Sequence, residues 1–383
     1  VTAVEGSISL TAGNGWWQNW YGGHGSLDAT GLNAGESVSL SASHADLSAN
    51  GVNAGNGSAS ASTTDGDVSV LDLAAPGSVS LWTNEGNLLL STRGPTGAVR
   101  MSTSKGDITL RDIFSTGAIS LSVSDGQLDV ERLTSADDLS LTSFKDIFAS
   151  GLTSLNGSVT ITGGSDWSGG TASIDASNIK AKQSVTMTTY EGNLTAKAVT
   201  AVEGSISLNA GSGWRQNWYG GHGDLDVTGL DAGQSVSLNA NQGSLTANSV
   251  TAMDGYISAS STLGATLRGA SATNSVYLTA AEGALEAERV SSGGNLSLTA
   301  SKGGILAENL AAVGNLTLTG STGFIHADKL TSIDGSVTIT GGNEWSGGTA
   351  SIDASNIKAK QSVTMATYEG NLTAKAVTAV EGS

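Results

Sequence analysis

The sequence predicts an all-β chain that folds as a right-handed parallel β-solenoid, with about 17 coils of roughly 20 residues each and no helices. The first observation is an apolar–polar–apolar triplet, Val79-Ser80-Leu81, which recurs along the whole chain at nearly constant steps, next at Val99 and Ile119. The second is that no window places apolar residues at the spacing of a helix. The third is composition, because 53 glycines and 13% charged residues suit a narrow core with many turns. Strict alternation of Val, Ile and Leu argues against a disordered chain.

Each coil follows the same order of elements. The triplet begins the coil as a short strand, and a polar corner such as Asp125-Gly126 follows it. A second apolar pair, Leu128 and Val130, and a third apolar residue, Leu133, come before the next corner. We therefore expect three short strands per coil, separated by turn residues, with one apolar stripe facing inward. A single coil cannot bury that stripe, so the coils stack in parallel. The crossover rule for parallel strands predicts the right-handed sense.

A longer period is nested on the shorter one. Residues 1–25 recur at 199–223 with three differences, and residues 377–383 begin a third copy. The first copy is longer than the second by one coil. We interpret the chain as superrepeat 1 (1–198, nine coils), superrepeat 2 (199–376, eight coils) and the start of superrepeat 3 (377–383). We expect one continuous rod, cut from a longer protein in which neighbouring superrepeats are its partners.

Charge and composition exclude several classes of partner. The net charge is −17 and no basic stripe is available to neutralise phosphates, so we expect no nucleic-acid partner. No apolar run is long enough for a membrane helix, and we expect no membrane insertion. The chain has no cysteine, which excludes disulfides and thiol metal sites and suits a protein that is exported unfolded.

The repeat motif places a glycine and a hydroxylated residue before the triplet and a second glycine after it. Examples are Gly77-Ser78-Val79-Ser80-Leu81 with Gly86-Asn87-Leu88, and Gly157-Ser158-Val159-Thr160-Ile161. Over essentially the whole chain this pattern resembles the repeats of filamentous-haemagglutinin-type exoproteins, the secreted partners of two-partner secretion systems in Gram-negative bacteria. The resemblance implies a right-handed parallel β-helix in an adhesin, a biofilm matrix protein or a toxin stalk, located at the cell surface or outside the cell. We therefore expect the structural shaft of a giant secreted surface fibre or adhesin.

Two kinds of insertion interrupt the coils at one corner, the turn after the triplet strand. The first kind fills residues 15–25 and 213–223, and the second fills 164–170 and 342–348. Seven of the eight tryptophans lie in these insertions, and only Trp82 does not. Because a solenoid core takes Val, Ile and Leu, we expect these rings on the outside of the rod. The candidate ligand-binding or packing residues are Trp16, Trp17, Trp20, Tyr21, Trp167, Trp214, Trp218, Tyr219 and Trp345.

Three interpretations of these aromatic residues stay open. Phe144, Trp167, Tyr190 and Trp214 or Trp218 fall on successive coils, roughly 4.8 Å apart, so they would stack into a ridge that stiffens the rod. Alternatively, the rings would form a platform for sugars in a carbohydrate-binding adhesive module. The hydrogen-bonding groups would then be Gln18, Asn19, His24 and Asp166. In the third interpretation, exposed aromatic patches join identical fibres side by side into a matrix.

The sequence predicts no enzyme. A glycosidase needs two carboxylates that face each other across a groove, whereas the acidic residues here are scattered over corners. The adjacent residues Asp137 and Asp138 would face opposite ways on a strand. His24 and His222 have glycines on both sides and no partner at the spacing of a nucleophile–base pair or a metal site. We expect no cofactor, and calcium at the acidic corners is the less favoured alternative because the calcium-binding nonapeptide is absent.

Overall fold

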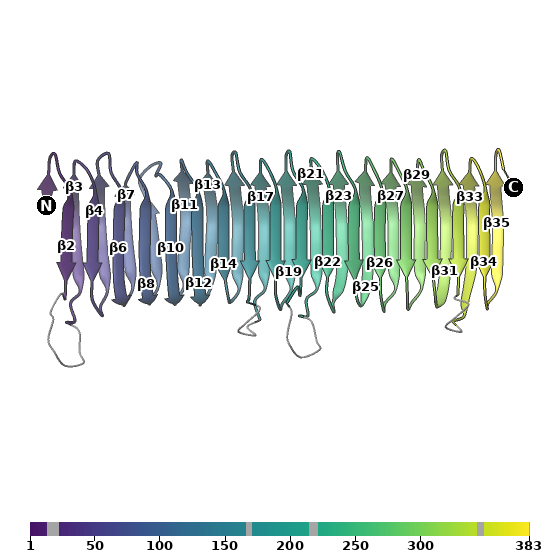
Figure 1. Ribbon diagram of the computed structural model, residues 1–383, viewed down its shortest axis with the longest axis horizontal. Helices are drawn as coiled ribbons and strands as arrows, with labels where there is room; N and C mark the ends of the chain where they lie inside the picture. The colour runs from purple at the N-terminus through teal and green to yellow at the C-terminus, as the bar shows by residue number, and fades with distance from the viewer. Residues whose placement is uncertain (14–22, 166–170, 214–220, 343–347, 383) are drawn as a thin grey trace. The chain divides into compact units, whose positions relative to one another are not determined.

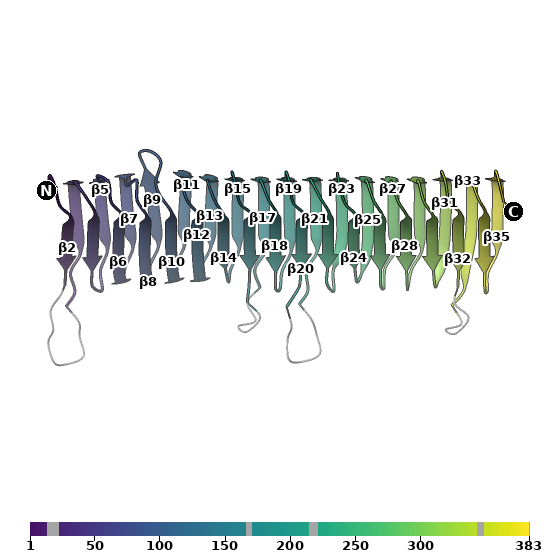
Figure 2. The ribbon, with the colours of Figure 1, turned by 45° about the horizontal axis from the view of Figure 1, so that its top comes forward.

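The computed structural model describes residues 1–13, 23–165, 171–213, 221–342 and 348–382. Strands are the regular structure of these residues, which contain no helix, and neighbouring coils pair in parallel (Figures 1 and 2). The arrangement is a β-solenoid of about 17 turns, with corresponding strands spaced at the period read from the sequence. The predicted fold class is confirmed.

The chain divides into two compact units, Val1–Thr186 (unit 1) and Met187–Ser383 (unit 2). In each unit the odd-numbered strands form one parallel sheet, sheet A, and the even-numbered strands form a second, sheet B. The triplets of the sequence are the strands of sheet B. The chain therefore alternates between the two sheets, with one corner at each crossing.

In unit 1, sheet A contains β1 (Thr2–Ala3), β3 (Leu27–Ala34), β5 (Leu47–Ala54), β7 (Val68–Ala74), β9 (Leu88–Thr92), β11 (Ile108–Ser115), β13 (Leu128–Ser135), β15 (Ile147–Ser154) and β17 (Ile174–Ala181). Its sheet B contains β2 (Ile8–Ala12), β4 (Val38–Ala42), β6 (Ala59–Asp65), β8 (Val79–Glu85), β10 (Val99–Lys105), β12 (Ile119–Asp125), β14 (Leu139–Ser143) and β16 (Val159–Gly163). The next strand of the chain is β18 (Val185–Thr189).

In unit 2, sheet A contains β19 (Leu194–Ala201), β21 (Leu225–Ala232), β23 (Ser244–Ala252), β25 (Gly264–Ala272), β27 (Leu285–Ser292), β29 (Ile305–Ala312), β31 (Gly323–Ser332), β33 (Ala350–Ala359) and β35 (Leu372–Ala379). Its sheet B contains β20 (Ile206–Ala210), β22 (Val236–Ala240), β24 (Ile257–Ser261), β26 (Val276–Ala280), β28 (Leu296–Ala300), β30 (Leu316–Gly320), β32 (Val337–Gly341) and β34 (Val363–Thr367).

The core is a set of columns that run from coil to coil. In β10, Val99 and Met101 are buried, whereas Arg100 between them faces outward. Val99 lies in register with Val79 of the preceding coil and Ile119 of the following one. Fully burying a side chain of this size contributes about 1.5–3 kcal/mol. The alternation read from the sequence is thus the alternation between core and surface.

The structure has two strands per coil where the sequence predicted three. The second apolar pair and the third apolar residue belong to one strand of sheet A, as in β11, where Ile108, Leu110 and Ile113 are all buried. Asp112 lies within this strand in the left-handed conformation, with a φ of 55°. This residue shifts the alternation of inward and outward side chains by one position. Apolar side chains on both sides of it therefore face the core, while the strand stays paired with β13.

A left-handed residue occupies this bend in every turn except those that contain β1 and β9. Glycine, which tolerates positive φ, occurs at Gly31, Gly51, Gly151, Gly229 and Gly269. Other residues occur at Asp72, Asp112, Arg132, Asn178, Ala198, Ser249, Arg289, Asn309, Lys329, Asn356 and Ala376. Because the left-handed conformation costs a non-glycine residue about 1–2 kcal/mol, packing of the apolar residues on either side must impose the bend.

A ladder of side chains links successive coils at the corner before sheet A. The Asn87 N–H donates to Asp67 Oδ1 over 2.7 Å, and the Asp107 N–H donates to Asn87 Oδ1 over 2.8 Å. The Gln127 N–H continues the series to Asp107 Oδ1 over 2.7 Å. Each side chain therefore satisfies a backbone donor of the next coil, which explains the Asp and Asn residues that follow the corner glycines.

A second ladder runs along the opposite corner, before sheet B. In unit 2 the Asn315 N–H donates to Asn295 Oδ1 over 2.8 Å, and the Ser336 N–H donates to Asn315 Oδ1 over 3.0 Å. In unit 1 the Ser58 N–H donates to Ser37 Oγ over 3.0 Å. The hydroxylated residue that precedes the triplet in the repeat motif is this ladder residue.

Candidate functional site

The sequence-predicted aromatic residues lie outside the residues that the structure describes. They are Trp16, Trp17, Trp20, Tyr21, Trp167, Trp214, Trp218, Tyr219 and Trp345, and the polar candidates Gln18, Asn19 and Asp166 lie outside as well. Their roles stay predictions. The residues that flank each insertion are described, and they locate where it leaves and rejoins its coil.

All four insertions begin at the same corner, after a strand of sheet B. The first kind follows β2 and β20, and the second follows β16 and β32. Gly13 and Gly211 lie two residues before the first kind and have φ values of 75° and 71°. Gly164 and Gly342 begin the second kind with φ values of 85° and 86°. The shared corner agrees with the prediction, and one left-handed glycine turns the chain out of the strand in each case.

The two ends of the insertion after β20 lie in close contact. A Cβ on Gly211 would meet the carbonyl oxygen of Gly221 and the amide nitrogen of Gly223, both at 2.7 Å, so the approach requires glycine. Asn241 donates from Nδ2 to the carbonyl oxygens of Gly211 (2.9 Å) and Gly221 (3.1 Å). The following coil therefore closes the base of this insertion.

His24 is the one predicted hydrogen-bonding candidate that the structure describes, and it belongs to the base of the first insertion. Its Nδ1 lies 3.3 Å from the carbonyl oxygen of His44, and the two ring centroids are 5.4 Å apart. His44 Nδ1 lies 2.6 Å from Asp65 Oδ2. These contacts tie the insertion to the next two coils. In the second copy Gln242 occupies the place of His44, so this arrangement is particular to the first.

Two of the acidic residues weighed for catalysis or calcium accept hydrogen bonds in the corner ladders. Asp138 lies in the corner before β14 rather than on a strand, and its Oδ1 accepts a hydrogen bond of 2.8 Å from the Ser158 N–H. Asp46 Oδ1 accepts one of 2.9 Å from the Asp67 N–H. Among the described residues, no group of three or more His, Cys, Asp or Glu side chains is placed to hold a metal ion.

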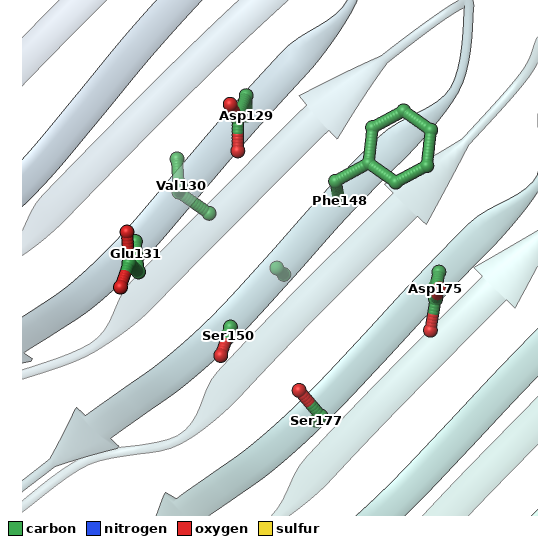
Figure 3. A pocket seen from close by; sticks show the side chains of 8 residues that line it. Asp129, Val130, Glu131, Phe148, Ser150, Asp175 and Ser177 are labelled. Atoms are coloured by element: carbon green, nitrogen blue, oxygen red, sulfur yellow. The ribbon is translucent and has the colours of Figure 1, made fainter.

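The outer face of sheet A in unit 1 carries a hollow of about 260 Å³ over β13, β15 and β17 (Figure 3). Phe148 lies between Asp129 and Asp175 in one row across the three strands. A second row contains Glu131, Ser150 and Ser177. The Phe148 side chain is 44% exposed, which leaves an aromatic ring open to solvent beside three carboxylates.

The carboxylates of this hollow differ in their partners. Arg111 Nη2 lies 3.5 Å from Asp129 Oδ2, and Arg111 Nε lies 3.6 Å from Glu131 Oε2. Arg132 also pairs with Glu131. Asp175, on the opposite side of the ring, makes no hydrogen bond or ion pair with any residue that the structure describes. On one side of the ring the carboxylates are therefore paired with arginines, whereas on the other side Asp175 is available as a hydrogen-bond acceptor.

The sequence analysis did not single out this hollow, although a signal for it exists. Phe148 lies between the inward-facing residues Ile147 and Ala149, so it occupies an outward position. In the neighbouring coils that position carries Asp129 and Asp175. A large aromatic residue at a position that is acidic in both adjacent coils is the feature that would have identified the site.

No protein-family model matches the chain, and neither the curated proteins nor the solved structures contain a match. The resemblance to filamentous-haemagglutinin-type repeats therefore stays a prediction from the motif. No helix in the described residues is long and apolar enough to span a membrane.

Proposed function

We propose that this chain is a structural shaft segment of a giant secreted surface fibre or adhesin. The observation that carries the proposal is that successive coils are joined by the same interactions. Within each unit, each coil pairs in parallel with the next, and side-chain ladders such as Asp67–Asn87–Asp107 repeat the link at the corners. In such an array, stability is a sum over coils and their interfaces, so length grows by adding equivalent units.

The two superrepeats support this proposal because they differ by one whole coil. Superrepeat 1 (1–198) is one coil longer than superrepeat 2 (199–376), and a change of that size keeps every inward position inward. An activity that depends on one fixed arrangement of residues would not be expected to tolerate the gain or loss of a whole coil. A shaft, whose function is to span a distance, tolerates such a change in length.

The proposed location is the bacterial cell surface or the space outside it. The motif resemblance, the absence of cysteine and the net charge of −17 support export and solubility as a long fibre. In this proposal the partners are neighbouring superrepeats of the same chain, and the shaft needs neither a cofactor nor enzymatic activity. Carbohydrate binding by the aromatic insertions and side-by-side association stay predictions of the sequence.

The proposal is tested by changing the number of coils and measuring length. Inserting a second copy of residues 199–376 adds eight coils, which at about 4.8 Å per coil should lengthen the particle by roughly 38 Å in negative-stain electron microscopy. A particle of unchanged length would contradict the shaft. Immunogold labelling of cells that produce the protein should mark fibres outside the cell envelope, and label confined to the cell interior would contradict the location.

A further inference from the structure

The hollow on sheet A of unit 1 has the size and shape for one small ring. Sites that enclose drug-sized ligands have volumes of about 300–1,000 Å³. At about 260 Å³, and open along the sheet face, this hollow suits a single ring of a longer chain rather than an enclosed molecule. Ser150 and Ser177 leave room beside Phe148 because their side chains are small (Figure 3).

The surroundings of the Phe148 ring combine an apolar face with hydrogen-bond acceptors. Strands in a sheet are about 4.8 Å apart, so Asp129 and Asp175 flank the ring on two sides at roughly 10 Å from each other. Asp175 is free to accept hydrogen bonds, and Arg111 holds Asp129 from the side away from the ring. An exposed aromatic face with a few convergent polar groups is the composition expected of a small-molecule site.

The charges favour a neutral ligand that donates hydrogen bonds over a cation. Arg111 lies against both Asp129 and Glu131, and Arg132 pairs with Glu131, so two of the three carboxylates already have a cationic partner. A further cation would be repelled by these guanidinium groups. Phenylalanine is also a weaker cation–π partner than tryptophan. The hydroxyl groups of a neutral ligand, by contrast, can donate hydrogen bonds to these carboxylates without displacing an ion pair.

We propose that the outer face of β13, β15 and β17 holds one pyranose ring of a neutral polysaccharide. The apolar face of the sugar packs on Phe148, and its hydroxyl groups donate to Asp175 and Asp129. This site uses none of the tryptophan insertions, and it does not depend on the proposed shaft function, which a length measurement tests separately.

Unit 2 contains a counterpart in which different residues occupy the same positions. β29, β31 and β33 place Leu306, His326 and Asp353 in the row that corresponds to Asp129, Phe148 and Asp175. His326 Nδ1 lies 3.7 Å from Asp353 Oδ2, and Phe324 stacks on the His326 ring at 6.4 Å. The carboxylate that has no partner in unit 1 therefore lies beside a histidine in unit 2, and His326 provides a matched control.

The test is saturation-transfer NMR on the full chain with methyl glycosides of glucose, galactose and mannose as probes. A single ring on so shallow a site is expected to bind with a Kd on the order of 1 mM, which this method detects. We expect transfer from aromatic protons to at least one glycoside. Phe148→Ala and Asp175→Asn should each reduce it by roughly fivefold or more, whereas His326→Ala should leave it unchanged.

Three results would overturn the inference. The first is no transfer to any of the three glycosides. The second is transfer that survives Phe148→Ala, which would assign sugar binding to the tryptophan insertions. The third is transfer only to tetramethylammonium, included as a cationic probe. Because Phe148 is exposed, the variants should keep the circular dichroism spectrum of the parent chain, and that spectrum verifies that they are folded.

Discussion

The row Asp129–Phe148–Asp175 and the row that contains Leu306, His326 and Asp353 occupy corresponding strands of the two units, yet they present different surfaces. The first leaves an aromatic ring exposed and one carboxylate free. In the second the carboxylate lies beside a histidine, and a phenylalanine ring stacks with the histidine ring.

The residues directly beneath these rows do not differ in the same way. Ile147 and Ile325, which precede Phe148 and His326 in the chain, are both fully buried and lie in register with apolar residues of the adjacent coils. The comparison teaches that the coil fixes its inner positions and leaves its outer positions free to vary. Residues that could bind a ligand or a partner must therefore be sought on the outer face.

The largest expected effect comes from the inner positions and should be equal in the two units. Ile147→Ala and Ile325→Ala each remove a fully buried side chain, so each should lower the free energy of unfolding by about 2–5 kcal/mol. The outer substitutions Phe148→Ala and His326→Ala should change it by less than about 0.5 kcal/mol. Chemical denaturation followed by circular dichroism measures all four. An outer substitution that lowers the free energy of unfolding as much as an inner one would contradict the distinction between inner and outer positions.

The corner glycines should give the next largest effect, again alike in both units. Gly106 and Gly303 both have a φ of 130°, a region essentially restricted to glycine, and a Cβ on either would collide with the carbonyl oxygen of the corresponding glycine one coil earlier. Alanine at either position should cost about 1–3 kcal/mol for the backbone conformation alone. Gly94→Ala is the control, because its Cβ would meet nothing within 4 Å. Equal thermal stability of Gly94→Ala and Gly106→Ala would contradict this account.

Removing one step of a ladder should have a smaller effect. Asn87→Ala in unit 1 and Asn295→Ala in unit 2 each leave a backbone N–H of the next coil without its side-chain acceptor. Each should lower the free energy of unfolding by about 1 kcal/mol. Amide hydrogen exchange should rise at Asp107 and at Asn315, and Asn→Asp at the same positions keeps the acceptor and should restore protection. Unchanged exchange in the alanine variants would show that the ladders do not link the coils.

The smallest expected effect is a pH-dependent difference in stability that involves the strands of the unit 2 row. Hydrogen bonds from Ser355 and Asn356 lower the pKa of the Asp328 carboxyl group, whereas unit 1 has Ser150 at this position. A carboxyl group whose pKa is lower in the folded state adds stability above its unfolded pKa of about 3.9, and that stability is lost as the pH falls through the folded pKa. Asp328→Ser should therefore lower Tm slightly at neutral pH, and the difference should vanish in acid. A difference in Tm between the variant and the parent chain that grows as the pH falls would contradict this prediction.

The sequence predicted the coils well because their inner positions obey one rule. Alternation such as Val99, Arg100 and Met101 reads directly as buried, exposed and buried. The bend in sheet A was not predictable in the same way, since eleven of its sixteen left-handed residues are not glycine and Arg132 or Ala198 gives no local signal for positive φ. Packing of the whole coil determines those bends.

The candidate sites were less predictable for a different reason. Tryptophan-rich insertions are conspicuous in a chain with so few aromatic residues, but their aromatic residues lie outside the described ones. The hollow at Phe148 depends on which residues lie across the sheet, and strands β13, β15 and β17 are separated by corners and an insertion of different lengths. Pairing Asp129 with Phe148 and Asp175 needs the register, which the structure supplies.

The central claim is that the coil is the interchangeable unit, and deleting one coil tests it most directly. Removing 296–315 takes out one whole coil, leaves Asn295 in the ladder position of Asn315 and brings β26 against the strands that follow. This account predicts that the shortened chain keeps its β-sheet circular dichroism and melts within a few degrees of the parent, whereas removal of 296–305, half a coil, abolishes cooperative melting. Loss of the fold in the full-coil deletion, to the same extent as in the half-coil deletion, would contradict it.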